Sequence, residues 1–472
     1  MRSENENESK LSRRDALKLM GISPIAAGVV ASAGSGTLTE AEAVDVKGKI
    51  VIVGGGSGAI MALARLHRAI RNPDITIIAP NETHLYQPGQ IFIAAGLYTP
   101  ADIVRPNKDF IPDDVRWIKD EATVFDPDRN RVKTRGGEEV VYDYLVVATG
   151  IEPHWEAIEG LTKEAIGKNG IASVYLNDFE AGTAEGGPIT WGWFNDVKYA
   201  AKHGRPTVLY TQPAGAIKCG GAPQKILYLS ADYLKKEGLG ADYIFATASQ
   251  KLFSLEPIAK SLAAAQKRYD KITNKFGHNL VAVDIGKKIA TFEHTYEVQG
   301  AYDSDLDMYD TVTKKERVEI GYDFLHVVAP MGAPKAVAES PLAWQKGNAK
   351  GYLEVDRYTL QHRRYPNVFG IGDVCGIPLG KTGGSARHHA PVIQDNLIAV
   401  MQGKKPVKKF DGYTVCPLKI RYGEIIMAEF NYDGLAPTIP FLAPQKPRWM
   451  WWAFDLYMLE PMYWYLMLRG LM

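Results

Sequence analysis

Residues 49–59 read KIVIVGGGSGA, and this stretch decides the fold of the chain. The apolar run Lys49–Val53 is typical of a buried strand, and the residues after the glycines have a helical pattern. Gly54, Gly56 and Ala59 fit the pattern G-x-G-x-x-A. In this pattern the first glycine makes a tight turn, the second admits a pyrophosphate, and the small third residue lets helix and strand pack closely. The stretch therefore predicts a dinucleotide site in an α/β fold.

The second expected strand, Asp74–Ile78, departs from the usual pattern at its end. An acidic residue there commonly binds the adenosine ribose, but this strand is followed by Ala79 and a proline. We expect Asn81 or Glu82 to supply the ribose contact from one turn later.

Two later segments indicate which dinucleotide binds. The aromatic and apolar run YDYLVVATG ends at Thr149 and Gly150, which is typical of flavoproteins. The run VFGIGD ends at Gly372 and Asp373, where the carboxylate can accept hydrogen bonds from a ribityl hydroxyl. These motifs, in this order after the glycine loop, predict FAD rather than NAD.

A second glycine-rich turn lies at residues 218–225, which read KCGGAPQK between an expected strand (206–212) and an expected helix (224–236). A nicotinamide cofactor would favour G-x-G-x-x-G at this point. Here the turn carries the thiol of Cys219 instead. The sequence therefore predicts that electrons come from a substrate that a thiol can bind.

The chain has three cysteines, at positions too far apart for a metal-binding C-x-x-C pattern. Cys219 and Cys375 each follow an expected strand, so we expect both at the carboxyl ends of parallel strands, facing one crevice. Lys218, beside Cys219, would favour its thiolate. Cys416 is expected to be structural. The alternative is that one or both of Cys219 and Cys375 are buried small hydrophobes.

Composition and the N-terminal sequence further limit the possible functions and location of the protein. The 472 residues carry 55 basic and 54 acidic side chains, which excludes the electrostatic footprint of a nucleic-acid-binding protein. Arg13 and Arg14 precede a weakly apolar stretch and a small-x-small site at Ala41–Ala43. This pattern predicts a twin-arginine export signal over residues 1–43 and a location on the periplasmic face of the membrane.

The mature chain resembles the sulfide:quinone oxidoreductase family, within the FAD-dependent disulfide oxidoreductases. The resemblance is carried by the glycine loop and by four further motifs: HLYQP at 84–88, KCGGAPQK at 218–225, LQHRRYPNVFGIGD at 360–373 and YTVCPL at 413–418. It implies that sulfide is oxidised to sulfane sulfur or polysulfide through a redox-active pair, matched here by Cys219 and Cys375. It also implies FAD as cofactor and a membrane quinone as electron acceptor. Residues 83–89 contain no cysteine, which argues against covalent attachment of FAD there.

The resemblance also implies roles for residues around the flavin. Glu156 would handle protons, although it could equally be an exposed loop acid. Lys381, at the start of an expected helix, would stabilise negative charge on the reduced flavin. Tyr422 and Phe430 are expected to contact the quinone ring.

The C-terminal tail is rich in aromatic residues. Four of the nine tryptophans fall within residues 449–464, and Pro461 is expected to divide the tail into two short helices. The uncharged runs are far shorter than the roughly 20 residues that cross a bilayer. Tryptophan, tyrosine and methionine on short helices favour a protein that lies on the lipid bilayer surface. The alternative is an aromatic core or dimer helix, so a homo-oligomer stays open.

The expected fold is α/β, with two Rossmann-like dinucleotide-binding domains, a C-terminal sheet and short amphipathic membrane helices. The expected parts are an FAD domain (47–160 and 331–400), a second Rossmann-like domain without an NAD loop (161–330), a C-terminal sheet (401–445) and a membrane tail (446–472). Three alternatives stay open: the flavoprotein subunit of a flavocytochrome c sulfide dehydrogenase, a type II NADH:quinone reductase and a flavin-binding sensor. The tail argues against the first, the missing NAD loop against the second and the thiols against the third.

Overall fold

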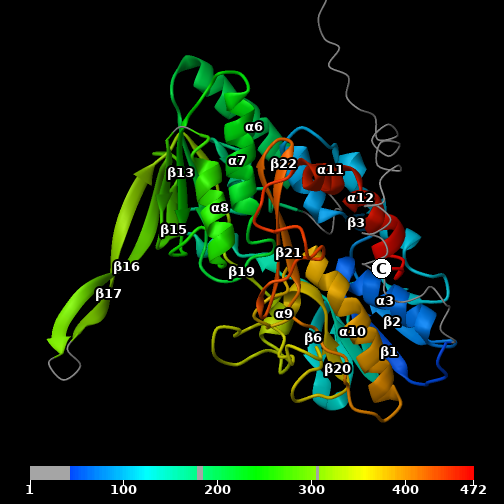
Figure 1. The fold of residues 1–472 in the computed structure, drawn as a ribbon. Coiled ribbons are helices and arrows are strands. Elements are labelled where there is room, and N and C mark those ends of the chain that lie inside the picture. The colour runs from blue at the N-terminus through cyan, green and yellow to red at the C-terminus, as the bar shows by residue number, and fades with distance from the viewer. Residues whose placement is uncertain (1–42, 178–183, 270, 304–307) are drawn as a thin grey trace, which may run out of the picture.

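The computed structural model describes residues 43–472, apart from 178–183, 270 and 304–307 (Figure 1). The export signal expected in residues 1–43 therefore lies almost wholly outside the described residues. The first sheet is five-stranded and parallel, in the order β20-β9-β1-β2-β5. Its strands are β1 (Lys49–Val53), β2 (Asp74–Ile78), β5 (Arg116–Ile118), β9 (Tyr144–Val147) and β20 (Val368–Gly370).

Two helices cover this sheet from distant parts of the chain. α3 (Ser57–Ala69) follows the glycine loop, and α10 (Gly383–Met401) packs beside it. The expected strands and helices of the first nucleotide site are thus confirmed. A small antiparallel sheet lies between β5 and β9 in sequence and consists of β6 (Ala122–Asp126), β7 (Arg131–Thr134) and β8 (Glu139–Val141).

The second large sheet is also five-stranded and parallel, in the order β11-β18-β12-β13-β14. Its strands are β11 (Ile171–Ala172), β12 (Thr207–Gln212), β13 (Asp242–Thr247), β14 (Ile272–Lys275) and β18 (Phe324–His326). The helices around it are α6 (Gly186–His203), α7 (Ala222–Lys235) and α8 (Glu256–Gln266). The prediction of a mixed α/β fold with parallel sheets is therefore confirmed.

A long hairpin projects from the second sheet, away from the rest of the molecule (Figure 1). β16 (Ile289–Asp303) pairs with β17 (Met308–Gly321) along its whole length, whereas β15 (His278–Asp284) pairs with β16 only as far as His294. Beyond that residue the hairpin is a two-stranded ribbon.

The C-terminal sheet lies between the two nucleotide-fold halves (Figure 1). β21 (Thr414–Arg421) and β22 (Glu424–Asn431) form an antiparallel hairpin, and β23 (Gly434–Leu435) adds a short third strand. β21 contacts α7 of the second half and α10 of the first. Residues of β21 therefore face the turn that precedes α7.

Short elements connect these layers. They are β3 (Thr83–Leu85), α4 (Gln90–Ala94), α5 (Pro100–Ile103), β4 (Val104–Pro106), β10 (Glu152–Pro153), β19 (Met331–Gly332) and α9 (Lys335–Ala338). Single turns of 3-10 helix occur at Gln87–Gly89, Asn107–Asp109, Pro127–Arg129, Trp155–Ala157, Lys163–Ala165 and Gly372–Val374.

The tail folds back onto the first half of the molecule as α11 (Trp449–Tyr457), α12 (Leu459–Met462) and one π-helical turn (Tyr463–Met467). The break falls at Met458 rather than at Pro461, which lies inside α12. Proline has no N–H to donate to the carbonyl four residues earlier, so the first helix ends at that carbonyl. Among the described residues, no helix is both long and apolar enough to cross a bilayer.

Candidate functional site

The glycine loop between β1 and α3 has the geometry of a phosphate cradle. Gly54 has a φ of 125°, and a Cβ there would lie 2.3 Å from the carbonyl oxygen of Ala148. A Cβ on Gly56 would meet nothing within 4 Å, so the space in front of the helix is open. α3 has no acidic residue in its first turn and no side-chain cap. Its first amides therefore face that space without a partner from the cap residue.

Two asparagine side chains hold the loop in place. Nδ2 of Asn81 donates to the Gly55 carbonyl at 3.2 Å, and Nδ2 of Asn107 donates to the same carbonyl at 3.1 Å. A Cβ on Gly55 would lie 2.2 Å from Oδ1 of Asn81. In the structure Asn81 thus contacts the glycine loop, whereas the sequence pointed to a ribose contact.

The remaining predicted cofactor residues line the same edge of the first sheet. Thr149 follows β9, and its buried Oγ1 has no hydrogen-bond partner within the described part of the chain. Gly150 and Gly372 have φ values of 73° and 80°, and a Cβ on either would meet nothing within 4 Å. Ala59 is fully buried where α3 packs on the sheet. An orphaned hydroxyl and an open glycine-lined edge fit a bound dinucleotide, so the residues present fit FAD.

Lys381 contacts the loop that contains Asp373 and Cys375, after β20. Nζ of Lys381 donates to the carbonyl oxygens of Asp373 at 2.5 Å and Cys375 at 3.0 Å. Burial raises the pKa of the Asp373 carboxyl and lowers the pKa of Lys381, each partly offset by the other's charge. Thr382 caps α10 by accepting a hydrogen bond from the Ser385 amide at 3.2 Å. Lys381 therefore stands just before a helix N-terminus, as the sequence predicted.

The turn that carries Cys219 is held in an uncommon conformation. Cys219 has a φ of 51°, in the left-handed region that a residue with a side chain rarely adopts. Its amide donates to the Lys381 carbonyl at 3.0 Å, and its own carbonyl accepts from the Tyr175 hydroxyl at 3.2 Å. These bonds from two other segments fix the half-buried thiol where β12 gives way to α7.

The neighbours of the Cys219 thiol are Cys416 and Lys225. Cys416 on β21 hydrogen bonds to the Cys219 sulfur, and Nζ of Lys225 lies 3.0 Å from that sulfur. The bond from Cys416, followed by the Lys225 charge, holds the pKa of Cys219 well below its usual range against the opposing effect of burial. The Cys219 sulfur therefore lies beside an ammonium group and a second thiol, an arrangement that favours its thiolate form.

Cys375, the expected partner, points elsewhere. Its side chain is fully buried in the core of the first half, and a Cβ on Gly370 would lie 2.9 Å from its sulfur. Burial raises the pKa of this thiol to about 12. Cys375 lies beyond β20, after the turn Gly372–Val374, and its side chain packs against Gly370 in the core. The assignment of Cys416 as merely structural is likewise at odds with its bond to Cys219.

The Lys218 ammonium group hydrogen bonds to a residue in the first half of the molecule. Its Nζ donates to Oε1 of Gln87 at 2.9 Å. Burial lowers the pKa of Lys218 to about 8, and the nearby Asp373 opposes that shift. Because Cys219 has a left-handed backbone, the side chain before it points to a different face. The cation at the sulfur is Lys225, in the first turn of α7. The sequence motif 218–225 contains this lysine, but the sequence alone predicted no role for it.

Three other predicted residues lie apart from the thiols. Glu156 is 76% exposed and contacts Nδ1 of His154 at 3.2 Å, as in the alternative reading of a loop acid. Tyr422 lies in the turn between β21 and β22 and donates to the Ala95 carbonyl at 2.9 Å. Phe430 pairs with Thr414 at the other end of the hairpin. At about 3.3 Å per residue, the backbones of the two residues are about 20 Å apart along the hairpin.

The tail reaches the glycine loop, a feature that the sequence did not predict. His84 is buried, and its Nδ1–H donates to Oδ1 of Asn107 at 3.0 Å. Its Nε2 lies 2.5 Å from the hydroxyl of Tyr463, in the tail. Burial lowers the pKa of His84 to about 4, so the ring is neutral and accepts from the tyrosine. Asn107 in turn holds Gly55, which links the tail to the loop in three contacts.

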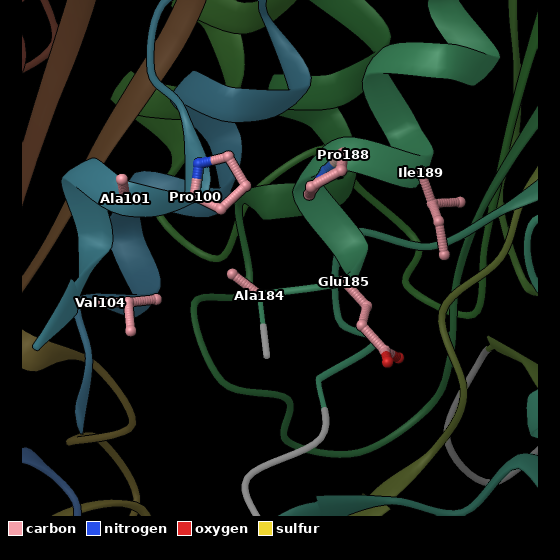
Figure 2. Close-up of a pocket in the computed structure, with 7 residues that line it drawn as sticks. All are labelled: Pro100, Ala101, Val104, Ala184, Glu185, Pro188 and Ile189. Carbon is pink, nitrogen blue, oxygen red and sulfur yellow. The ribbon is translucent and has the colours of Figure 1, made fainter. Parts of the chain in front are cut away.

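A surface pocket of about 600 Å³ lies between α5 and the start of α6 (Figure 2). Its lining is largely apolar: Pro100, Ala101, Val104, Ala184, Glu185, Pro188 and Ile189. It contains neither the thiols nor any predicted cofactor residue, so it is separate from the site described above.

Known proteins resemble this chain in sequence and in fold. Residues 48–185 match the family model described as pyridine nucleotide-disulphide oxidoreductase. The chain is 36% identical over 448 residues to the mitochondrial sulfide:quinone oxidoreductase of Dictyostelium discoideum, covering 94% of this chain and 91% of that protein. It is 34% identical to the Mus musculus protein of the same name, covering 89% and 86%. The solved sulfide:quinone oxidoreductase of Aquifex aeolicus is 21% identical, with a TM-score of 0.68 and coverage of 90% and 92%, which shows a shared fold.

Proposed function

Because the chain belongs to the sulfide:quinone oxidoreductase family of enzymes, we propose that it oxidises sulfide to sulfane sulfur or polysulfide and passes two electrons through FAD to a membrane quinone. The observation that carries this proposal is the contact of Cys219 with both Cys416 and Lys225. A thiolate, a second thiol and a buried ammonium group are the parts that thiol–disulfide exchange needs.

The redox-active pair of the proposal is Cys219 and Cys416. Hydrosulfide, the anion of hydrogen sulfide, is a nucleophile that can attack a bridge between these sulfurs. The thiol with the lower pKa is the better leaving group in such an exchange. Since Cys219 has the lowered pKa and Lys225 stabilises its thiolate, attack falls on Cys416.

The exchange balances as follows. A bond forms between hydrosulfide sulfur and Sγ of Cys416, the bond between Cys416 and Cys219 breaks, and Cys219 leaves as a thiolate with the bonding pair. A second hydrosulfide or another sulfur nucleophile then takes the outer sulfur from the Cys416 persulfide. That transfer leaves a reduced Cys416, and the pair must give up two electrons to form its bridge again.

FAD, when bound, supplies a carrier that accepts two electrons from thiols and delivers them to a quinone. The residues that would hold it are those of the glycine loop, with Thr149 and Gly150 after β9 and Gly372 after β20. Lys381, beside the N-terminus of α10, would stabilise negative charge in the same region.

The tail and its surroundings are proposed to lie on a lipid surface. Trp449 and Phe441 are 75% and 84% exposed, whereas Trp451 and Trp464 are buried against the body. Part of the aromatic tail thus packs inside, and the exposed remainder suits the membrane interface. The export route predicted from Arg13 and Arg14 stays a prediction.

Rapid mixing of the purified, FAD-loaded protein with sulfide tests the function. Bleaching of the flavin absorbance by sulfide, and its recovery on adding a short-chain quinone, are the expected results. Cytochrome c in place of the quinone should give no recovery. An enzyme whose flavin stays oxidised in sulfide, or responds equally after Cys219→Ser, does not work in the proposed way.

A further inference from the structure

The tail contributes a buried carboxylate close to the thiol pair. Nζ of Lys419 lies 2.5 Å from Oδ2 of Asp455, with side chains 3% and 1% exposed. Lys419 is on β21, three residues after Cys416, and Asp455 is on α11. Nζ of Lys419 also lies 4.5 Å from the centre of the Phe92 ring on α4. This ion pair is therefore enclosed by protein.

The charged groups around the thiols form one buried set. α7 contributes Lys225, β21 contributes Lys419 and α11 contributes Asp455, and the charges of all three act on Cys219 or on one another. Tyr86 and Tyr175 face the same region, and burial raises the pKa of both far above neutral, so they stay uncharged. Asp373, after β20, also interacts with the Cys219 charge and is itself offset by Lys381 and Lys218. On the side of β21 and α11, two ammonium groups then face one carboxylate and one thiolate. Buried charges are costly unless paired, so this balance matters.

We propose that Asp455 is a positioning residue for the redox-active cysteine pair: by holding Lys419, it leaves Lys225 as the single counter-ion of the Cys219 thiolate. The C-terminal tail thereby completes the thiol site in addition to any contact with lipid. The inference rests on the proposed function only in taking Cys219 and Cys416 as the reactive pair.

The proposal predicts that replacing Asp455 and replacing Lys419 shift the pH midpoint of Cys219 ionisation in opposite directions. Asp455→Asn leaves the Lys419 charge uncompensated, which stabilises the thiolate and lowers the pH midpoint of Cys219 ionisation. Lys419→Met leaves the Asp455 charge uncompensated, which competes for Lys225 and raises that midpoint. Each shift should be on the order of one pH unit, as for other close buried charges. Removing both charges together should return the midpoint close to the wild-type value.

Alkylation of the reduced, full-length protein by iodoacetamide between pH 4 and pH 10 measures these midpoints. Trypsin releases Cys219 in the peptide 219–225, so its modification can be followed by mass spectrometry apart from that of Cys375 in 365–381. The matched control is Glu460→Gln, which removes the other buried tail carboxylate, paired with Arg105 at 3.6 Å. It should leave the Cys219 midpoint unchanged, and Cys375 should stay unreactive in every variant.

The double variant Lys419→Met with Asp455→Asn should fold even if a single variant does not. Replacing both partners of a buried ion pair is tolerated better than removing one partner. Thermal unfolding and FAD absorbance report the fold of each variant. The proposal is overturned if neither single change moves the midpoint, if both move it the same way, or if the double variant keeps the shift of either single one. Because alkylation needs no turnover, these outcomes are independent of whether sulfide reduces the flavin.

Discussion

Nζ of Lys225 lies 3.0 Å from Sγ of Cys219, although six positions separate the two residues along the chain. The left-handed turn at Cys219 and the first turn of α7 bring the two groups together. Lys225 is 3% exposed, so water screens its charge poorly. The ammonium group is therefore the main fixed cation at the sulfur.

Replacing Lys225 by Met should raise the pKa of Cys219, because the thiolate loses its counter-ion. Sulfide-dependent flavin reduction at pH 7 should fall by about tenfold or more, since one pKa unit is a factor of ten in thiolate. Lys225→Arg should restore most of the rate. Lys218→Met is the matched control, because Nζ of Lys218 donates to Oε1 of Gln87. An equal or larger effect at Lys218 would contradict the assignment.

Cysteine substitutions should separate the two candidate pairs. Cys416→Ser removes the bridging sulfur and should abolish sulfide-dependent flavin reduction while leaving FAD bound. Cys375→Ala should retain that reduction, at a cost in stability of about 1–2 kcal/mol for a buried side chain. Stopped-flow absorbance and urea unfolding provide the two measurements. The reverse pattern, an active Cys416→Ser and an inactive but folded Cys375→Ala, would restore the pair expected from the sequence.

Two glycines in one loop should respond differently to alanine. Gly54→Ala puts a methyl group 2.3 Å from the Ala148 carbonyl at a φ of 125° and should destabilise the protein by several kcal/mol. Gly56→Ala meets no protein atom within 4 Å, so the fold should persist while FAD affinity falls. Equilibrium unfolding and FAD titration of the apoprotein measure the two effects. Normal FAD affinity in folded Gly56→Ala would argue against this cradle.

Acid should destabilise the protein partly through His84. Its folded pKa is lowered to about 4 from a usual value of 6.5, so the unfolded chain binds a proton that the folded chain refuses. Stability is therefore lost as the pH falls from 6.5 to 4, by on the order of 3 kcal/mol from this residue. His84→Gln should be less stable at pH 7, and its difference from wild type should shrink at pH 4.5. Urea unfolding measures both proteins at the two pH values. An equal stability difference between wild type and His84→Gln at pH 7 and at pH 4.5 would exclude this contribution.

Lipid binding should depend on the exposed aromatic residues near the tail. Trp449→Glu combined with Phe441→Glu should lower binding to liposomes by about tenfold or more, because both rings leave water on insertion. Thermal stability should be unchanged, since both side chains are exposed. Val407→Glu, at a site 78% exposed elsewhere, is the control and should bind normally. Flotation with quinone-free vesicles measures binding without turnover.

Sequence reasoning found the nucleotide fold because local pattern determines it. The runs before Gly54 and Cys219 are continuous and apolar, and the residues after them are helical, so the strands and helices appeared within about two residues of their predicted bounds. Thr149, Gly150 and Gly372 were predicted from the same pattern, because each lies in the loop after a strand of the parallel sheet.

The thiol pairing could not be found in this way, since it depends on where a separate sheet docks. Cys416 lies on β21, and only the packing of that hairpin against α7 brings it to Cys219. The only hint of this pairing in the sequence was the motif 413–418 around Cys416. This motif is part of the resemblance, but Cys416 itself was expected to be structural. Asp455 and Tyr463 lie in a tail whose composition suggested lipid, and composition does not reveal which side chains turn inward.

The docking of the last sheet and tail has a consequence for biosynthesis. A ribosome that has made the glycine loop and the first thiol has still to make the strand with the second thiol and the helix with the buried carboxylate. Until those segments emerge and pack, the nascent chain can neither bring the two thiols together nor balance the buried charges around them. The proposed chemistry with reactive sulfur therefore begins only after these segments have been made, and termination before them should yield inert fragments rather than uncontrolled oxidants.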